Sequence, residues 1–232
     1  MTRSRQYDDP CGIARALDRV GERWALLVIR ELLLGPKRFG ELRRGVPMMS
    51  PNVLTQRLDE LCALGVVERQ PLEAPPNTWA YALTPWGYDL EPVLIALARW
   101  GSRATPVPRG ELSVDALLLA LRTTLATEGA TGPPLAVELR LEGSRYRARI
   151  ADGRLDITRR APPPGSGATH DEDVVATIEL DAATLRRIAF GGLALAAARH
   201  DGAVQITGDA RAAARFLGSF RRPTPAGGAS RG

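Results

Sequence analysis

The sequence has few residues of several kinds, and each shortage excludes a class of protein. Only Cys11 and Cys62 are cysteines, too few for a disulfide framework or a four-cysteine zinc site. The only histidines are His170 and His200, and His170 lies in an acidic cluster typical of a solvated turn. No GxSxG, P-loop, GxGxxG or HExxH motif occurs. We therefore expect no enzymatic activity, no metal and no cofactor.

Long apolar runs are also missing. No stretch approaches the roughly 18 apolar residues of a membrane-spanning helix, and the first ten residues, MTRSRQYDDP, lack the apolar core of a signal peptide. The low cysteine content fits a reducing compartment. These absences predict a cytoplasmic protein with no membrane partner.

What the chain has in quantity is arginine and aliphatic side chains. Its hydrophobic fraction of 44% suffices for a packed core, and its net charge is +5. Lys37 is the single lysine, so arginine carries nearly all of the positive charge. A modest basic balance permits an anionic partner without requiring one.

Breaks rich in proline and glycine divide the chain into two halves. The first half is mostly helical, whereas the second contains alternating runs typical of strands. The expected organisation is an N-terminal arm (1–9), a mostly helical domain (10–104), a linker (105–111), an α+β domain (112–220) and a disordered tail (221–232).

The first half has the element order of a winged helix-turn-helix. A short helix anchored by Phe39 and Leu42 precedes Ser50-Pro51, a cap-plus-proline start for a longer helix. After Gly65, the segments GVVERQ and WAYALT alternate as two strands around a turn-rich loop. We predict a mainly helical domain with a β wing.

The helix that begins at Ser50 has two unlike faces. One is apolar, with Leu54, Leu58, Leu61 and Cys62, and the opposite one carries Asn52, Thr55, Gln56 and Asp59. Asparagine and glutamine side chains can pair with adenine edges in a major groove, while nearby cations meet phosphates. The expected DNA contacts are Lys37, Arg38, Arg43, Arg44, Ser50, Asn52, Val53, Thr55, Gln56, Arg57, Asn77 and Thr78.

A simpler interpretation of the polar face is ordinary solvation, because any surface helix carries such residues. Asp59 would also repel phosphate unless it is paired. The ordered set of elements supports DNA binding more strongly than the face alone.

Residues 10–103 resemble the HxlR family of bacterial winged-helix transcription regulators. The resemblance rests on Cys11 and on ALDRVGERW (16–24), IRELLLGPKRFGELRRGVP (29–47), SPNVLTQRLDEL (50–61), GVVER (65–69), YALTPWG (81–87) and PVLIALARWG (92–101). It implies a homodimer on a roughly palindromic double-stranded operator, with recognition helix 50–64 and wing 71–78. The chain departs from the family's GGKW with Gly21-Glu22-Arg23-Trp24 and from its PGIS with Pro47-Met48-Met49-Ser50.

An apolar stripe supports the implied homodimer. Leu90, Val93, Leu94, Leu97 and Trp100 share one side of a predicted helix that starts at Thr84-Pro85 and is kinked at Pro92. Such a stripe either packs on its own domain or pairs with a second copy.

Cys11 has two interpretations. Some members of the family sense oxidants or electrophiles through a cysteine near this position, and Arg15 one turn later would favour a thiolate. The alternative is a small buried hydrophobic residue, which we also expect for Cys62.

The second half is predicted to be an α+β layer domain. A capped helix from Ser113 precedes a meander of three strands, a further strand, a helix capped by Asp181, a late strand and a final helix. Residues 176–220 resemble the sterol carrier protein 2 (SCP2)-like fold, with V.I.GD before the last helix.

That resemblance implies an apolar cavity for a lipid-like effector. Its candidate walls are Leu117, Leu121, Ile188, Phe190, Leu193, Leu195 and Phe216. The alternative is that these residues simply fill a core.

We therefore expect a dimeric transcription regulator whose second domain binds an apolar effector. Two alternatives stay open: a purely structural or dimerising second domain, and a lipid carrier whose winged helix contacts protein.

Overall fold

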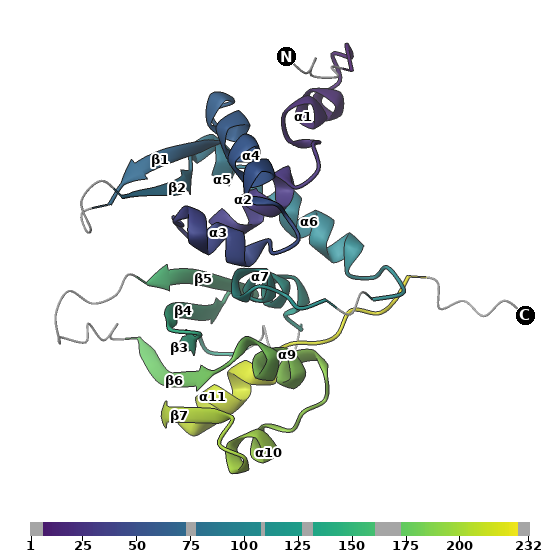
Figure 1. Cartoon of the computed structure of the whole chain (residues 1–232). Coiled ribbons are helices and arrows are strands. Elements are labelled where there is room, and N and C mark those ends of the chain that lie inside the picture. Colours follow the sequence, from purple (N-terminus) through teal and green to yellow (C-terminus); the bar gives the residue numbers. More distant parts are fainter. Residues whose placement is uncertain (1–6, 73–77, 108–109, 127–131, 161–172, 227–232) are drawn as a thin grey trace, which may run out of the picture. The chain divides into compact units, whose positions relative to one another are not determined.

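A computed structural model describes residues 7–72, 78–107, 110–126, 132–160 and 173–226 (Figure 1). The chain forms two compact units, Met1–Leu94 and Ile95–Gly232. The division falls inside a helix, whereas the sequence places the linker at 105–111. In the described ranges, no helix is both long and apolar enough to span a bilayer.

The first unit has the predicted order of helices and wing strands. Its helices are α1 (Gly12–Val20), α2 (Ala25–Leu32), α3 (Phe39–Gly45), α4 (Pro51–Ala63) and α5 (Pro85–Tyr88), and its strands are β1 (Val67–Pro71) and β2 (Trp79–Leu83). The two strands pair antiparallel, from Val67 opposite Leu83 to Pro71 opposite Trp79. Val28, Ile29 and Leu32 of α2 are fully buried and form the centre of this unit.

The helix predicted from Thr84 onward is two helices, so the expected kink at Pro92 was wrong. The chain leaves α5 after Tyr88 and re-enters a helix as α6 (Glu91–Gly101). Pro92 is thus the second residue of α6. Proline is tolerated in the first turn of a helix, where its missing N–H would have no intrahelical partner.

The second unit is a five-stranded sheet with helices on one face. Its strand order is β5-β4-β3-β6-β7, and only the β3–β6 pair is parallel. The strands are β3 (Leu135–Leu141), β4 (Ser144–Ala151), β5 (Arg154–Arg160), β6 (Val174–Leu180) and β7 (Val204–Gly208), and the helices are α7 (Val114–Thr124), α9 (Ala182–Phe190), α10 (Leu195–His200) and α11 (Ala210–Leu217). The predicted α+β character of this half is confirmed.

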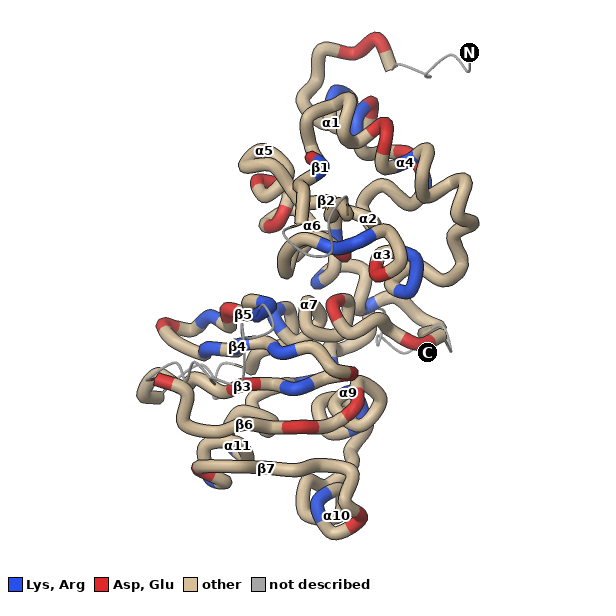
Figure 2. The backbone as a smooth tube through the Cα atoms, turned by 60° about the vertical axis from the view of Figure 1, so that its left-hand side comes forward, with Lys and Arg blue, Asp and Glu red and all other residues tan. Residues whose placement is uncertain are grey.

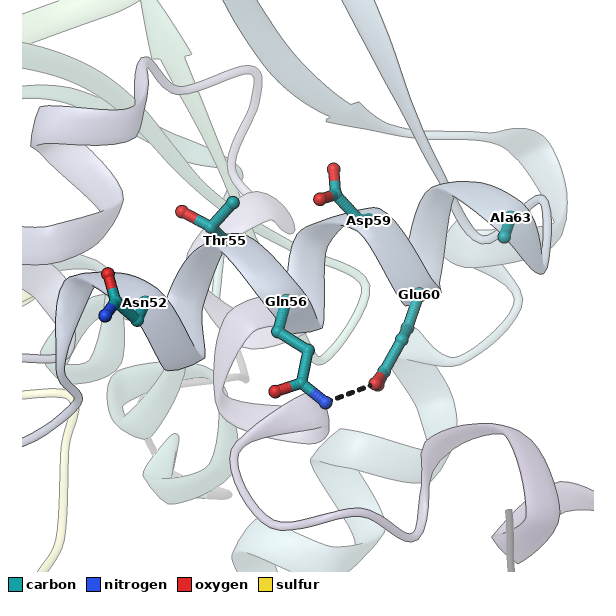
Figure 3. A pocket seen from close by; sticks show the side chains of 6 residues that line it. All are labelled: Asn52, Thr55, Gln56, Asp59, Glu60 and Ala63. Atoms are coloured by element: carbon teal, nitrogen blue, oxygen red, sulfur yellow. Dashed lines mark hydrogen bonds between the residues drawn. The ribbon is translucent and has the colours of Figure 1, made fainter. Parts of the chain in front are cut away.

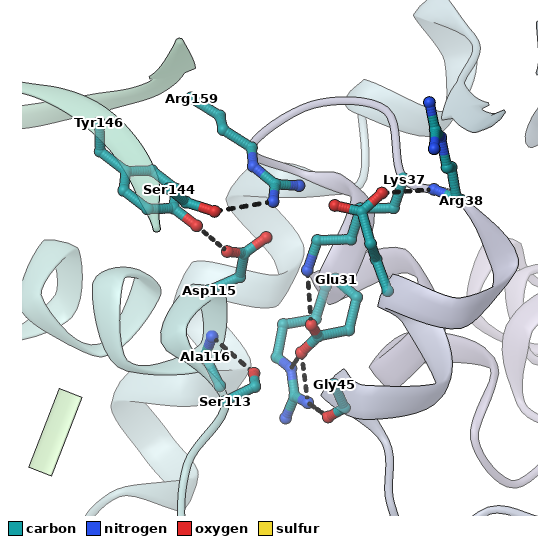
Figure 4. A network of polar contacts seen from close by, with 12 residues as sticks. Glu31, Lys37, Arg38, Gly45, Ser113, Asp115, Ala116, Ser144, Tyr146 and Arg159 are labelled. Atoms are coloured by element: carbon teal, nitrogen blue, oxygen red, sulfur yellow. Dashed lines mark hydrogen bonds and ion pairs between the residues drawn. The ribbon is translucent and has the colours of Figure 1, made fainter. Parts of the chain in front are cut away.

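Alternation along the strands places the core on the helix side of the sheet. Val137, Leu139 and Ile178 are fully buried there, as is Phe216 of α11. Tyr146 is also buried on this side, where its hydroxyl donates a hydrogen bond to Asp115 of α7 at 2.9 Å (Figure 4). Burial and the neighbouring carboxylate both raise the pKa of Tyr146, so the phenol stays protonated.

Part of the expected disordered tail is attached to the second unit. The Arg221 N–H donates to the Thr124 carbonyl at 2.9 Å, and the Ala226 N–H donates to the Arg103 carbonyl at 2.8 Å. These backbone hydrogen bonds order the chain up to Ala226, which composition alone did not predict.

Candidate DNA-binding face

Helix α4 is fixed at its start and along its apolar face. The Ser50 hydroxyl accepts a hydrogen bond from the Val53 N–H at 3.4 Å, and Pro51 occupies the first helical position, as predicted. Leu54, Leu58 and Leu61 are buried in the unit's core. The apolar face therefore orients the helix so that its other face points outward.

The outward face of α4 borders an open hollow. Figure 3 shows Asn52, Thr55, Gln56, Asp59, Glu60 and Ala63 along it. Three of these side chains, Asn52, Thr55 and Gln56, are neutral hydrogen-bonding groups in the N-terminal two turns of the helix. The two carboxylates lie in the C-terminal half.

Both carboxylates on this face have cationic or polar partners. Asp59 Oδ1 lies 2.6 Å from Arg69 Nη2 on strand β1, so the predicted need for a partner is met. Glu60 pairs with Arg57 and accepts a hydrogen bond from Gln56 Nε2 at 2.9 Å. Because these pairs compensate the two negative charges, a phosphate backbone can approach the neutral half of the helix.

Lys37 does not lie on the exposed surface where a phosphate contact would place it. The residue is 6% exposed, and its Nζ lies 2.8 Å from Glu31 Oε2. Its backbone N–H and carbonyl pair with Tyr81 of β2 at 2.9 and 2.8 Å. Lys37 therefore connects the wing to the core.

Arg57 also differs from the expectation. It is 8% exposed, and its guanidinium pairs with Glu60 and lies 3.7 Å from Glu22 Oε2. Glu22 is the residue at which the chain departs from the family's GGKW pattern, and Arg57 is its partner here. We therefore assign Arg57 to internal pairing rather than to phosphate.

The remaining predicted cations are accessible. Arg38, Arg43 and Arg44 are exposed at the start and the end of α3. Val53 is half-buried, as is Thr78, whose carbonyl accepts from the Leu72 N–H at 2.9 Å across the base of the wing. Asn77 lies outside the described residues.

A buried carboxylate that the sequence analysis missed joins the helices behind this face. Glu31 of α2 is fully buried, and its Oε1 accepts from Arg30 Nη2 at 2.8 Å while its Oε2 accepts from Lys37 (Figure 4). Arg30 Nη2 also lies 3.4 Å from the Gly45 carbonyl. A Cβ at Gly45 would come within 2.1 Å of Glu31 Oε2, so glycine is required for this approach. The only sequence signal was the adjacent pair Arg30-Glu31 inside a helix whose other residues are apolar.

Comparison with known proteins agrees with this geometry. Residues 19–108 match the model of the HxlR-like helix-turn-helix family. An uncharacterized HTH-type transcriptional regulator of Bacillus subtilis, YybR, is 35% identical over 91 residues, which are 39% of this chain and 73% of that protein. This chain belongs to the HxlR-like helix-turn-helix family.

Two further similarities each cover less than half of the HxlR-like chain. An uncharacterized HTH-type transcriptional regulator of Mycobacterium tuberculosis is 41% identical over 98 residues. The match spans 42% of this chain and 61% of that relative's length. A solved structure of the redox regulator HypR in its oxidized form is 34% identical, with a TM-score of 0.40, and covers 42% of this chain and 100% of that one. The family model and the order of α3, α4, β1 and β2 together confirm the predicted N-terminal winged helix-turn-helix.

Helix α6 of the HxlR-like chain presents part of the predicted apolar stripe. Leu94 is buried and Leu90 half-buried, whereas Val93, Leu97 and Trp100 are 55%, 45% and 75% exposed. The stripe therefore divides into a buried anchor and an exposed apolar surface. Large apolar side chains grouped in this way mark an interaction surface.

The two cysteines of the HxlR-like chain lie in contrasting environments. Cys11 is exposed at the start of α1, where the backbone N–H groups of Ile13 and Ala14 stabilise a thiolate and lower its pKa. Burial raises the pKa of the half-buried Cys62 thiol, and Arg69 opposes that effect only in part. Of the two interpretations of Cys11, the structure therefore excludes the buried one, and the expected core position of Cys62 holds in part.

This difference predicts selective alkylation. At neutral pH, iodoacetamide should modify Cys11 faster than Cys62, because a lowered pKa and full access both increase the reactive thiolate. Peptide mass spectrometry over a time course would measure the two rates. Cys11→Ser should remove the fast phase alone, and equal rates at both sites would contradict the assignment.

The candidate cavity residues of the second unit separate into two groups. Leu117, Leu121 and Phe216 are buried and belong to the core. Ile188, Phe190, Leu193 and Leu195 are half-buried at the end of α9 and the start of α10. The second group is the accessible part of the predicted set.

Proposed function

We propose that this HxlR-like regulator binds a two-fold operator as a homodimer, with the N-terminal half of α4 in the major groove. The observation that carries the proposal is the outward face of Asn52, Thr55 and Gln56, next to carboxylates that are already paired. Arg38, Arg43 and Arg44 would contact phosphates, which position the helix without reading sequence. The exposed stripe on α6 supplies the apolar surface for the second copy.

Fluorescence anisotropy would test operator binding. The purified protein is titrated with duplexes from its own upstream region and with a scrambled duplex, over a salt series. We expect a native duplex to bind roughly 10³-fold or more tightly, with affinity falling steeply as salt rises. If every duplex binds like the scrambled control, operator recognition is contradicted, and a lipid carrier with a protein-contacting winged helix becomes the better explanation.

Substitutions on and beside α4 should separate base readout from phosphate contact. Asn52→Ala and Gln56→Ala should each reduce the difference in binding free energy between the native and scrambled duplexes by about 1–3 kcal/mol, because each removes a base-edge hydrogen bond. Arg44→Ala should instead weaken binding to both duplexes equally and reduce the slope of log affinity against log salt concentration by about one. If Gln56→Ala weakens binding to both duplexes equally, the Gln56 side chain contacts the DNA phosphate backbone and not a base.

A second candidate function concerns an SCP2-like effector site. The half-buried Ile188, Phe190, Leu193 and Leu195 favour an apolar ligand that shifts the population of DNA-competent dimers. Native mass spectrometry after incubation with a cell lipid extract should then show a bound lipid, and the lipid should change operator affinity. If neither effect occurs, the second unit is better explained as a dimerising or spacing module. A dimerising role predicts that the protein truncated after residue 110 is a monomer.

A further inference from the structure

The sheet of the second unit has one face that its own described helices do not cover. Strand alternation turns Val137, Leu139 and Ile178 toward the helices and turns Glu138, Arg140 and Thr177 the other way. On the uncovered side the side chains are mostly exposed or half-buried, as in antiparallel sheets with one solvated face. We define this side as the outer face.

Arginines dominate the outer face of β3, β4 and β5. Figure 2 shows that basic positions recur along these three strands. The cross-strand register places six arginines on the outer face: Arg140, Arg145, Arg147, Arg149, Arg154 and Arg160. Among the described strands, the acids on the same face are Glu138, Asp156 and Glu179. Asp173, which directly precedes β6, forms an ion pair with Arg147. The face therefore has an excess of positive charge.

The arrangement of these arginines is unfavourable for the sheet itself. Arg140, Arg145 and Arg160 lie directly opposite one another in one row across β3, β4 and β5. Like charges at directly opposed positions destabilise a sheet. Glu138 compensates part of this repulsion, since it accepts from Arg140 Nε at 2.8 Å and from Arg145 Nε at 3.0 Å. Burial opposes its ionisation, but these hydrogen bonds outweigh burial and lower the pKa of Glu138.

The geometry suits an extended polyanion. Arg145, Arg147 and Arg149 repeat along β4 at about 6.8 Å, twice the rise of an antiparallel strand, so the cations form a line along the strand. Guanidinium groups bind phosphate oxygens through two parallel hydrogen bonds. Duplex DNA offers one negative charge per about 1.7 Å of its axis.

We propose that the outer face is a second DNA-contacting surface, which binds the phosphate backbone of duplex DNA without reading its sequence. The proposal rests on the function proposed above, because a polyanion must be present wherever the regulator acts. A lipid headgroup surface fits less well. The apolar residues on the described part of the face are Ala136, Ala151 and Val175, which offer little to insert into a bilayer.

Matched charge removal in the full-length protein would test this surface. The sheet variant carries Arg149→Gln, Arg154→Gln and Arg160→Gln. The control variant carries Arg187→Gln, Arg199→Gln and Arg211→Gln, which are exposed and belong to the helices of the same unit. Both lose the same net charge. Circular dichroism checks folding, and Arg154→Gln alone, on an exposed edge-strand residue, replaces the triple variant if that variant does not fold.

The readout is the dependence of scrambled-duplex affinity on salt. The sheet variant should lower the slope of log affinity against log salt by about two to three, because each lost phosphate contact removes roughly 0.9. The control variant should leave the slope near that of the wild type. The proposal is wrong if neither variant changes the salt slope, or if both variants reduce it by the same amount.

Two further measurements distinguish this proposal from operator recognition by α4 and from binding to an anionic membrane. The native-to-scrambled affinity ratio of the wild type reports on α4 alone, so a ratio near one refutes operator recognition while the salt slope still tests the sheet. Vesicles containing phosphatidylglycerol test the other anionic partner. If the sheet variant loses vesicle binding but keeps the wild-type DNA slope, the outer face is a membrane surface and the DNA proposal is wrong.

Discussion

Leu97→Asp is expected to convert the proposed dimer into monomers and to weaken operator binding by about 10²- to 10⁴-fold, because two linked half-site contacts gain that much over one. Leu97 lies between Val93 and Trp100 on the exposed side of α6, so an aspartate there would bury a charge in the interface. Because Leu97 is half-exposed in the single chain, the monomer should stay folded. Sedimentation velocity would give the oligomeric state, and anisotropy the affinity.

Leu112→Asp is the matched control for that experiment. Leu112 is also an exposed leucine, outside α6, and the change in charge is identical. It should leave both the oligomeric state and operator affinity close to those of the wild type. If Leu97→Asp stays dimeric while Leu112→Asp dissociates, the second copy binds elsewhere than on α6.

Glu31→Gln is expected to lower the free energy of unfolding of the winged helix by about 3–5 kcal/mol, the typical cost of breaking a buried ion pair from one side. The amide would leave Arg30 and Lys37 facing a neutral group in the core. Chemical denaturation followed by tryptophan fluorescence reports on this region, since all four tryptophans lie between Trp24 and Trp100.

Glu22→Gln provides the comparison for an exposed acid. The Glu22 side chain is mostly exposed and lies 3.7 Å from Arg57, so its loss should cost less than about 1 kcal/mol. A cost for Glu31→Gln as small as this would mean that the buried network does not hold the helices together. A large cost would make Glu31 the residue that fixes α2, α3 and the wing behind the DNA-binding face.

Local patterns were sufficient to predict most elements. The start of α4 followed from Ser50 and Pro51, and the start of α9 from Asp181, whose Oδ1 accepts from the Thr184 N–H at 2.6 Å. Capping and side-chain periodicity depend on residues within one turn or one strand, so a sequence contains them directly. The same holds for the apolar face that orients α4, which made the outward residues predictable.

The availability of each charged side chain was decided by tertiary structure. Lys37 and Arg57 carry the same charge as Arg43 and Arg44, yet the first two are buried against acids and the last two are exposed. Composition cannot distinguish them, because the distinction depends on which parts of the chain fold against each position.

Pairings between distant residues were likewise invisible in the sequence. Arg69 on β1 reaches back ten residues to Asp59, and the row of arginines on the outer face appears only when the register of β3, β4 and β5 is known. The sequence by itself therefore determined the winged-helix order, the caps and the outward face of α4. The tertiary structure decided which cations remain accessible to DNA, because burial and strand register bring together charges that are far apart along the chain.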